Sequence, residues 1–125
     1  MGTDPIHGLS KALLDHGTIA VVQADAGGCF AFWNAAAEQI FGYAAAEVLG
    51  HRIDLLVPPE YRDMHWAGFN RTIGSTWRGA DAWGEIEALH KSGERIALEV
   101  LLTPISGADG SVLSVMGMFR RPAGG

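Results

Sequence analysis

Apolar residues recur along this chain with two different periods. Before Ala82 the spacing is mostly three and four, as on one face of a helix, except in two short runs rich in β-branched and aromatic residues. From Ala82 onward the period is two, which is typical of strands with one buried face. The predicted strands cover 18–25, 29–33, 83–90, 95–105 and 111–119. Because these strands are segregated from the helices, we predict an α+β domain with an antiparallel sheet and helices on one face.

Two short helices are predicted in the middle of the chain. Asn34 is a suitable N-cap for a helix over 35–41, and Gly42 can close that helix in the left-handed conformation. A second helical unit over 43–50 ends at Gly50, and its capping position carries no side-chain oxygen.

A further amphipathic helix is predicted near the N-terminus. Ile6, Leu9 and Leu13 recur at spacings of three and four, and Gly17 ends the segment. This helix either packs on its own domain or provides a dimer contact. We therefore divide the chain into a flanking helix at 1–17, a domain at 18–121 and a tail at 122–125.

The segment that follows Pro58-Pro59 contains the most informative pattern. The two prolines forbid a continuing helix, so a new helix is expected to begin at Glu60 or Tyr61. On that helix one face carries Tyr61, His65, Phe69 and Thr72. A histidine on such a face is either a core histidine with a hydrogen-bond partner or an axial ligand of a flat iron cofactor between helix and sheet.

Composition narrows the class of protein. A length of 125 residues suits one domain, and a net charge of -5 argues against a nucleic-acid partner. The single cysteine, Cys29, fits a reducing cytoplasm. No signal peptide and no run of about 20 apolar residues is present, so we predict a cytoplasmic protein without a membrane segment.

The chain shows no motif for catalysis. It contains no Walker-type Gly-x-x-x-x-Gly-Lys, no Gly-x-Ser-x-Gly and no His-Glu-x-x-His. Glu85 and Glu87 are better explained as solvated charges than as an acid–base pair. We therefore expect a domain that is not an enzyme.

Five fragments, in this order and spacing, resemble the PAS family. They are FWNAAAEQIFGY at 32–43, EVLG at 47–50, LVPPEYR at 56–62, WGEI at 83–86 and KSGER at 91–95. The resemblance implies a five-stranded antiparallel sheet that cradles a pocket used for sensing and dimerisation. It also implies a homodimer and an attached output domain: a histidine kinase, a cyclic-di-nucleotide enzyme or a transcription regulator.

The same resemblance suggests what the pocket binds. Light-sensing flavin members carry a reactive cysteine in a Gly-x-Asn-Cys-Arg-Phe-Leu-Gln helix, which is missing here. Heme-binding oxygen-sensor members place an axial histidine seven residues after a proline, as Pro58 and His65 do. Those sensors also have a bulky residue where this chain has Gly68, and a gas-contacting arginine where it has Gly84.

Heme b is therefore the candidate cofactor, with His65 as the axial ligand of its iron. The alternatives are another small ligand or none, in which case the domain would be a ligand-free interaction module. The predicted lining of the pocket is His65, Phe69, Gly68, Ile86, Leu98, Leu102, Phe41, Val115 and Met118.

Overall fold

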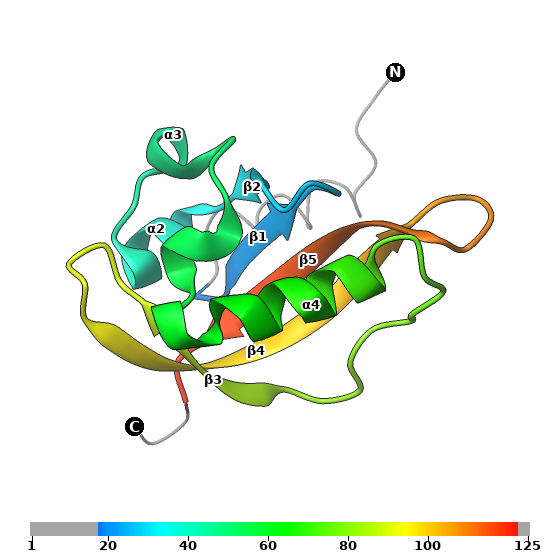
Figure 1. The fold of residues 1–125 in the computed structure, drawn as a ribbon. Helices are drawn as coiled ribbons and strands as arrows, with labels where there is room; N and C mark the ends of the chain where they lie inside the picture. The colour runs from blue at the N-terminus through cyan, green and yellow to red at the C-terminus, as the bar shows by residue number, and fades with distance from the viewer. Residues whose placement is uncertain (1–17, 123–125) are drawn as a thin grey trace.

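The structure, a computed structural model, describes residues 18–122 and contains one five-stranded sheet (Figure 1). The strand order is β2-β1-β5-β4-β3, and every neighbouring pair is antiparallel. The strands are β1 (Ala20–Ala24), β2 (Phe30–Trp33), β3 (Gly84–Leu89), β4 (Arg95–Ser106) and β5 (Val112–Arg120). The predicted α+β class and five-stranded antiparallel sheet are confirmed. The helix predicted over 1–17 lies outside the described residues.

All helices of the described region lie between β2 and β3 in the sequence and cover one face of the sheet (Figure 1). They are α2 (Ala35–Phe41), α3 (Ala45–Val48), the 3₁₀ turns η1 (Ile53–Leu56) and η2 (Pro59–Tyr61), and α4 (Arg62–Thr72). Within residues 18–122, no helix combines the length and the apolar character needed to cross a bilayer.

Asn34 joins α2 to the sheet. Its side-chain oxygen accepts hydrogen bonds from the backbone N–H groups of Ala37, at 3.0 Å, and Val21, at 2.9 Å. Its amide nitrogen donates to the backbone carbonyl of Ile19 at 3.0 Å. The predicted helix cap is therefore also a buried link between two elements, and Gly42 ends the helix at φ 83° as expected.

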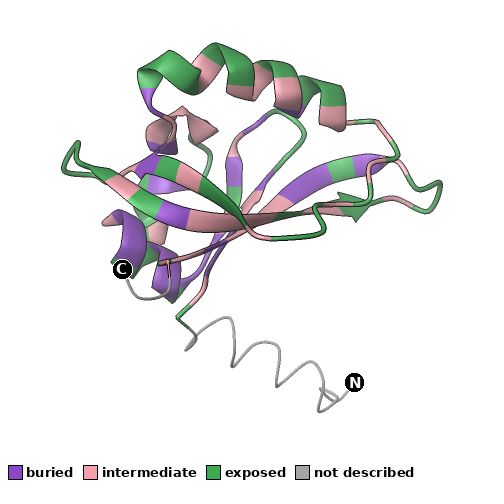
Figure 2. Cartoon of the chain, turned by 90° about the horizontal axis from the view of Figure 1, so that it is seen from below, coloured by how far each residue is buried: buried purple, intermediate pink, exposed green. Residues whose placement is uncertain are grey.

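Two hydrophobic clusters lie on the helical side of the sheet. The larger cluster lies beneath α2. In it the ring of Phe41 makes a tilted contact with Trp33 and an edge contact with Phe119, each at 5.3 Å between ring centroids. The smaller one contains Phe69 and Val115. Figure 2 shows that α4 is exposed or half-buried along most of its length, and Phe69 is its one buried residue. α4 therefore contributes a single buried residue to the core.

Candidate functional site

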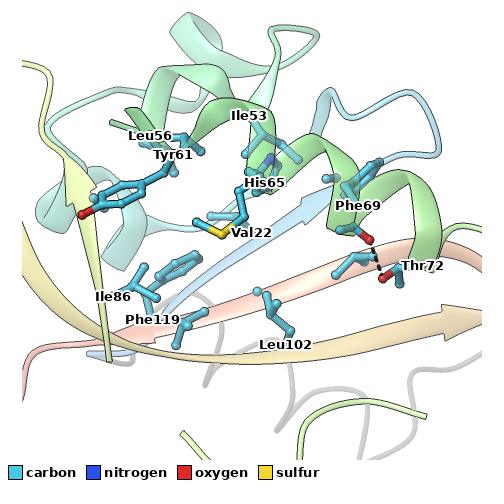
Figure 3. A pocket seen from close by; sticks show the side chains of 18 of the residues that line it. Val22, Ile53, Leu56, Tyr61, His65, Phe69, Thr72, Ile86, Leu102 and Phe119 are labelled. Atoms are coloured by element: carbon cyan, nitrogen blue, oxygen red, sulfur yellow. Dashed lines mark hydrogen bonds between the residues drawn. The ribbon is translucent and has the colours of Figure 1, made fainter. Parts of the chain in front are cut away.

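A cavity of about 790 Å³ lies between α4 and the sheet (Figure 3). This volume lies within the range of cavities that hold small-molecule ligands and cofactors. The helical wall includes Tyr61, Met64, His65, Gly68 and Phe69, and the strand wall includes Val22, Ile86, Val100, Leu102, Val115 and Phe119. Side chains of both walls point toward one another (Figure 3). Because most of them are apolar, the interior of the cavity is mainly apolar.

The predicted shared face of the helix lies against the cavity. All four of its residues, Tyr61, His65, Phe69 and Thr72, line the cavity. Thr72 donates its hydroxyl to the backbone carbonyl of Gly68 at 2.9 Å, so that polar group is satisfied within the helix. The Pro58-Pro59 bend directs this helix across the sheet, and both residues precede its first α-helical turn as expected.

His65 is the polar group at the centre of the helical wall. Its ring is half-buried, and its buried Nδ1 atom has no hydrogen-bond partner among residues 18–122. Burial lowers the pKa of His65, and the carboxylate of Asp54 opposes this shift more weakly. The imidazole is therefore neutral at neutral pH, which is the form that binds metals. The described residues contain no cluster of three or more His, Cys, Asp or Glu side chains that could hold a metal ion by themselves.

Six of the nine predicted lining residues border the cavity: His65, Phe69, Gly68, Ile86, Leu102 and Val115. Three do not, which corrects the prediction. Phe41 and Leu98 are fully buried in the larger core cluster. Met118 lies on the opposite face of β5 from its neighbours Gly117 and Phe119, which both line the cavity.

The sequence-based prediction missed several residues of the wall. Trp77 reaches the cavity from the segment between α4 and β3, for which no regular element was predicted. Arg71, Glu85 and Glu87 also border it. Arg71 is the cation of this group, and it makes no hydrogen bond or ion pair with the residues that the structure describes. The cavity thus has an apolar interior and charged groups at its border.

An ion-pair network ties β4 to the start of the helical wall. The Arg95 guanidinium donates to Glu60, with one contact at 2.9 Å, and to Glu87 at 3.0 Å. The hydrogen bond from Arg95 is the largest cause that lowers the pKa of Glu60 to about 2. All three side chains are largely exposed, so solvent screens this network.

This network predicts a specific loss of stability in acid. Because Glu60 has a lower pKa in the folded state than its usual 4.5, its contribution is present above that value and is lost as the pH falls toward 2. The free energy of unfolding should therefore fall more between these two pH values in the wild type than in Glu60→Gln. Glu94→Gln, on an exposed neighbouring carboxylate, is the control and should follow the wild type. Parallel curves for the wild type and Glu60→Gln would contradict the assignment.

Comparison with known proteins agrees with this architecture. A family model described as "PAS fold" matches residues 9–122. The oxygen sensor protein DosP of Escherichia coli is 35% identical over 83 residues, which are 65% of this chain and 10% of that protein. An uncharacterized protein of Azorhizobium caulinodans is 36% identical over 66 residues, or 52% of this chain and 9% of that protein. The chain thus spans about a tenth of the length of these curated relatives.

Solved structures show the same fold. The PAS domain of a Colwellia psychrerythraea protein has a TM-score of 0.77 and 25% identity, and the match covers 95% of this chain and 98% of that one. A domain of a Geobacter sulfurreducens sensor histidine kinase/response regulator gives a TM-score of 0.69 at 22% identity, covering 95% and 99%. The match to the family model, the strand order and the helical layer agree: this chain belongs to the PAS family, whose members are sensory modules.

Proposed function

We propose that this domain is a sensor that binds heme b between α4 and the sheet, with His65 as the axial ligand. The observation that carries the proposal is the imidazole of His65, which borders an apolar cavity and has no hydrogen bond to the described residues. Leaving a buried nitrogen unpaired costs free energy, so a purely structural histidine is expected to have a partner. A histidine that binds iron is instead expected to face a cavity in its neutral form.

Other residues around the cavity fit the same group. Gly68 lies next to His65 on the cavity side, and a Cβ atom there would have only the Arg71 guanidinium nearby, at 4.0 Å. A flat ring can therefore approach the helix closely. The free guanidinium of Arg71 would pair with the carboxylates of heme b, while the aliphatic strand wall would cover the macrocycle. The group itself supplies an iron that can change its oxidation state or take up a small gas.

The similarity to the oxygen sensor DosP supports heme, although one feature differs from the heme-binding sensors of the family. Gly84 stands where those sensors place an arginine, and a Cβ atom there would meet nothing within 4 Å. The strand wall therefore offers no guanidinium to a ligand of the iron.

Titration with hemin tests the proposal. The wild type should bind one hemin per chain and develop a Soret band. Val115→Trp should weaken binding by at least ~10-fold, because a bulky ring from this buried cavity residue occupies the space that the ligand needs. Leu113→Trp is the matched control, since Leu113 lies on the same strand but is 55% exposed. Equal affinity in all three proteins, or no binding by the folded wild type, would contradict the proposal.

We further propose that the domain forms a homodimer and controls an output domain in a longer protein. The sheet face away from α4 carries the half-buried apolar residues Leu101, Met116 and Met118, and such a face can pair with that of a second copy. Sedimentation should show a dimer in the wild type and a monomer after Leu101→Glu combined with Met118→Glu. A wild-type monomer at high concentration would contradict this part of the proposal.

A further inference from the structure

The ring of His65 packs against two aromatic side chains, Trp66 and Phe69, which also contact each other at 5.5 Å between ring centroids. Its centroid lies 5.1 Å from that of Trp66, at an interplanar angle of 79°, and 6.1 Å from that of Phe69, at 23°. Metal-binding histidines usually donate their second ring N–H to an acceptor that fixes the orientation of the ring. The part of the chain that the structure describes offers Nδ1 of His65 no such acceptor, so the contacts that constrain the ring are aromatic.

Trp66 is itself fixed on three sides. Its indole Nε1 donates to the Oδ1 atom of Asp54 at 2.7 Å. The Arg52 guanidinium lies over the ring, with Cζ 4.3 Å from the centroid. A Cβ atom on Gly28 would come within 2.3 Å of two carbons of the indole, so only glycine leaves room for the ring there. The indole cannot change its rotamer without breaking these contacts.

The groups that surround Trp66 belong to segments that are bonded to one another. The backbone N–H of Ile53 donates to the carbonyl of Gly28 at 3.0 Å, and the N–H of Phe30 donates to the carbonyl of His51 at 2.9 Å. Cys29 and Arg52 form an isolated β-bridge between these bonds. The β1–β2 turn and residues 51–54 are therefore bonded into one unit. The contacts of Trp66 with this unit anchor α4 to it.

From this arrangement we infer that Trp66 is a positioning residue for His65, taking the place of the hydrogen-bond acceptor that orients most metal-binding histidines. The inference rests on the proposed heme site and adds to it a residue that packs against the axial ligand, His65, without being a ligand itself. Asp54 acts on the orientation of His65 through Trp66, because its carboxylate accepts the hydrogen bond that holds the indole. An imidazole without an acceptor is also a less basic ligand than one with its N–H donated to a carboxylate or carbonyl.

A set of four variants tests this role. Trp66→Leu removes the ring and should speed the dissociation of hemin by at least ~10-fold, as loss of an outer-shell partner does at other metal sites. Trp66→Phe keeps an aromatic edge near His65 and should have a smaller effect. Asp54→Asn keeps an acceptor for the indole N–H and should stay within ~2-fold of the wild type. Trp83→Leu is the control, because Trp83 packs under Arg120, with its centroid 3.8 Å from Cζ, rather than against His65.

Two spectroscopic readouts separate positioning from simple stability. In the hemin-loaded protein, Trp66→Leu should broaden the ferric electron paramagnetic resonance signal, which reports the orientation of the axial imidazole. In the protein without hemin, the NMR cross-peaks between the His65 and Phe69 ring protons should weaken in Trp66→Leu, because the imidazole is then free to turn, and stay unchanged in Trp83→Leu.

The outcomes also distinguish the two proposals. Unchanged hemin dissociation and unchanged cross-peaks in Trp66→Leu overturn the positioning role, as does an equal effect of Trp83→Leu on both readouts. If the wild type never develops a Soret band, the heme proposal fails. In that case the NMR cross-peaks alone decide: a loss confined to Trp66→Leu supports the positioning of His65, and unchanged cross-peaks reject it.

Discussion

Replacing His65 with alanine should abolish the Soret band that the wild-type protein develops with hemin. The helical wall of the proposed site offers one imidazole to the iron, and no other histidine of residues 18–122 borders the cavity. His65→Gly should regain a band when free imidazole is added, because the vacated space then accepts the exogenous ligand. His51→Ala, on an exposed histidine outside the cavity, is the control and should match the wild type.

The stability of His65→Ala distinguishes a ligand-binding histidine from a structural one. A histidine that satisfies a buried partner would leave that partner unpaired after truncation, at a cost of about 1–3 kcal/mol. His65 has no such partner among the described residues, so His65→Ala should lower the free energy of unfolding by less than about 1 kcal/mol in the protein without hemin. An equally strong Soret band in His65→Ala would reject the axial role, whatever the effect on stability.

Asn34→Ala should cause the largest loss of stability. The substitution leaves the backbone N–H groups of Val21 and Ala37 and the carbonyl of Ile19 without the partners that the side chain provides. Each unsatisfied buried group costs about 1–3 kcal/mol, and partial relaxation reduces the sum, so we expect a loss of about 3–5 kcal/mol. Denaturant unfolding measures it.

Two further substitutions serve as an intermediate case and as a control for that measurement. Asn34→Asp keeps the acceptor oxygen but loses the donor to the Ile19 carbonyl, so its loss should be smaller than that of Asn34→Ala. Asn70→Ala changes an exposed asparagine on α4 and should cost less than about 0.5 kcal/mol. A loss below 1 kcal/mol for Asn34→Ala would show that the link between α2 and β1 does not stabilise the fold as described.

Local rules were sufficient to predict most of the fold. Asn34 and Gly42 bound α2 as their capping chemistry requires, and the period of two located all three C-terminal strands to within a residue or two. The bend at Pro58-Pro59 located the helix that carries His65. These features depend on neighbouring residues, so a single sequence contains the information needed to predict them.

The cavity was harder to predict, because its shape depends on contacts between distant segments. Val115 and Met118 are three residues apart on one strand, so they face opposite sides, and the period of two already excluded one of them. Leu98 shares a face with Leu102 but lies deeper in the core, which periodicity cannot distinguish. The contact between Gly28 and Trp66 joins residues far apart in the sequence, and no local pattern indicates it.

The visible absorption spectrum of the protein, purified from cells supplied with iron and a heme precursor, tests the central claim most directly. Heme bound in the cavity through His65 predicts a coloured protein with a Soret band, which the His65→Ala protein prepared in the same way lacks. A folded wild-type protein that is colourless and remains so with excess hemin, or one that shows a flavin spectrum, would contradict the claim.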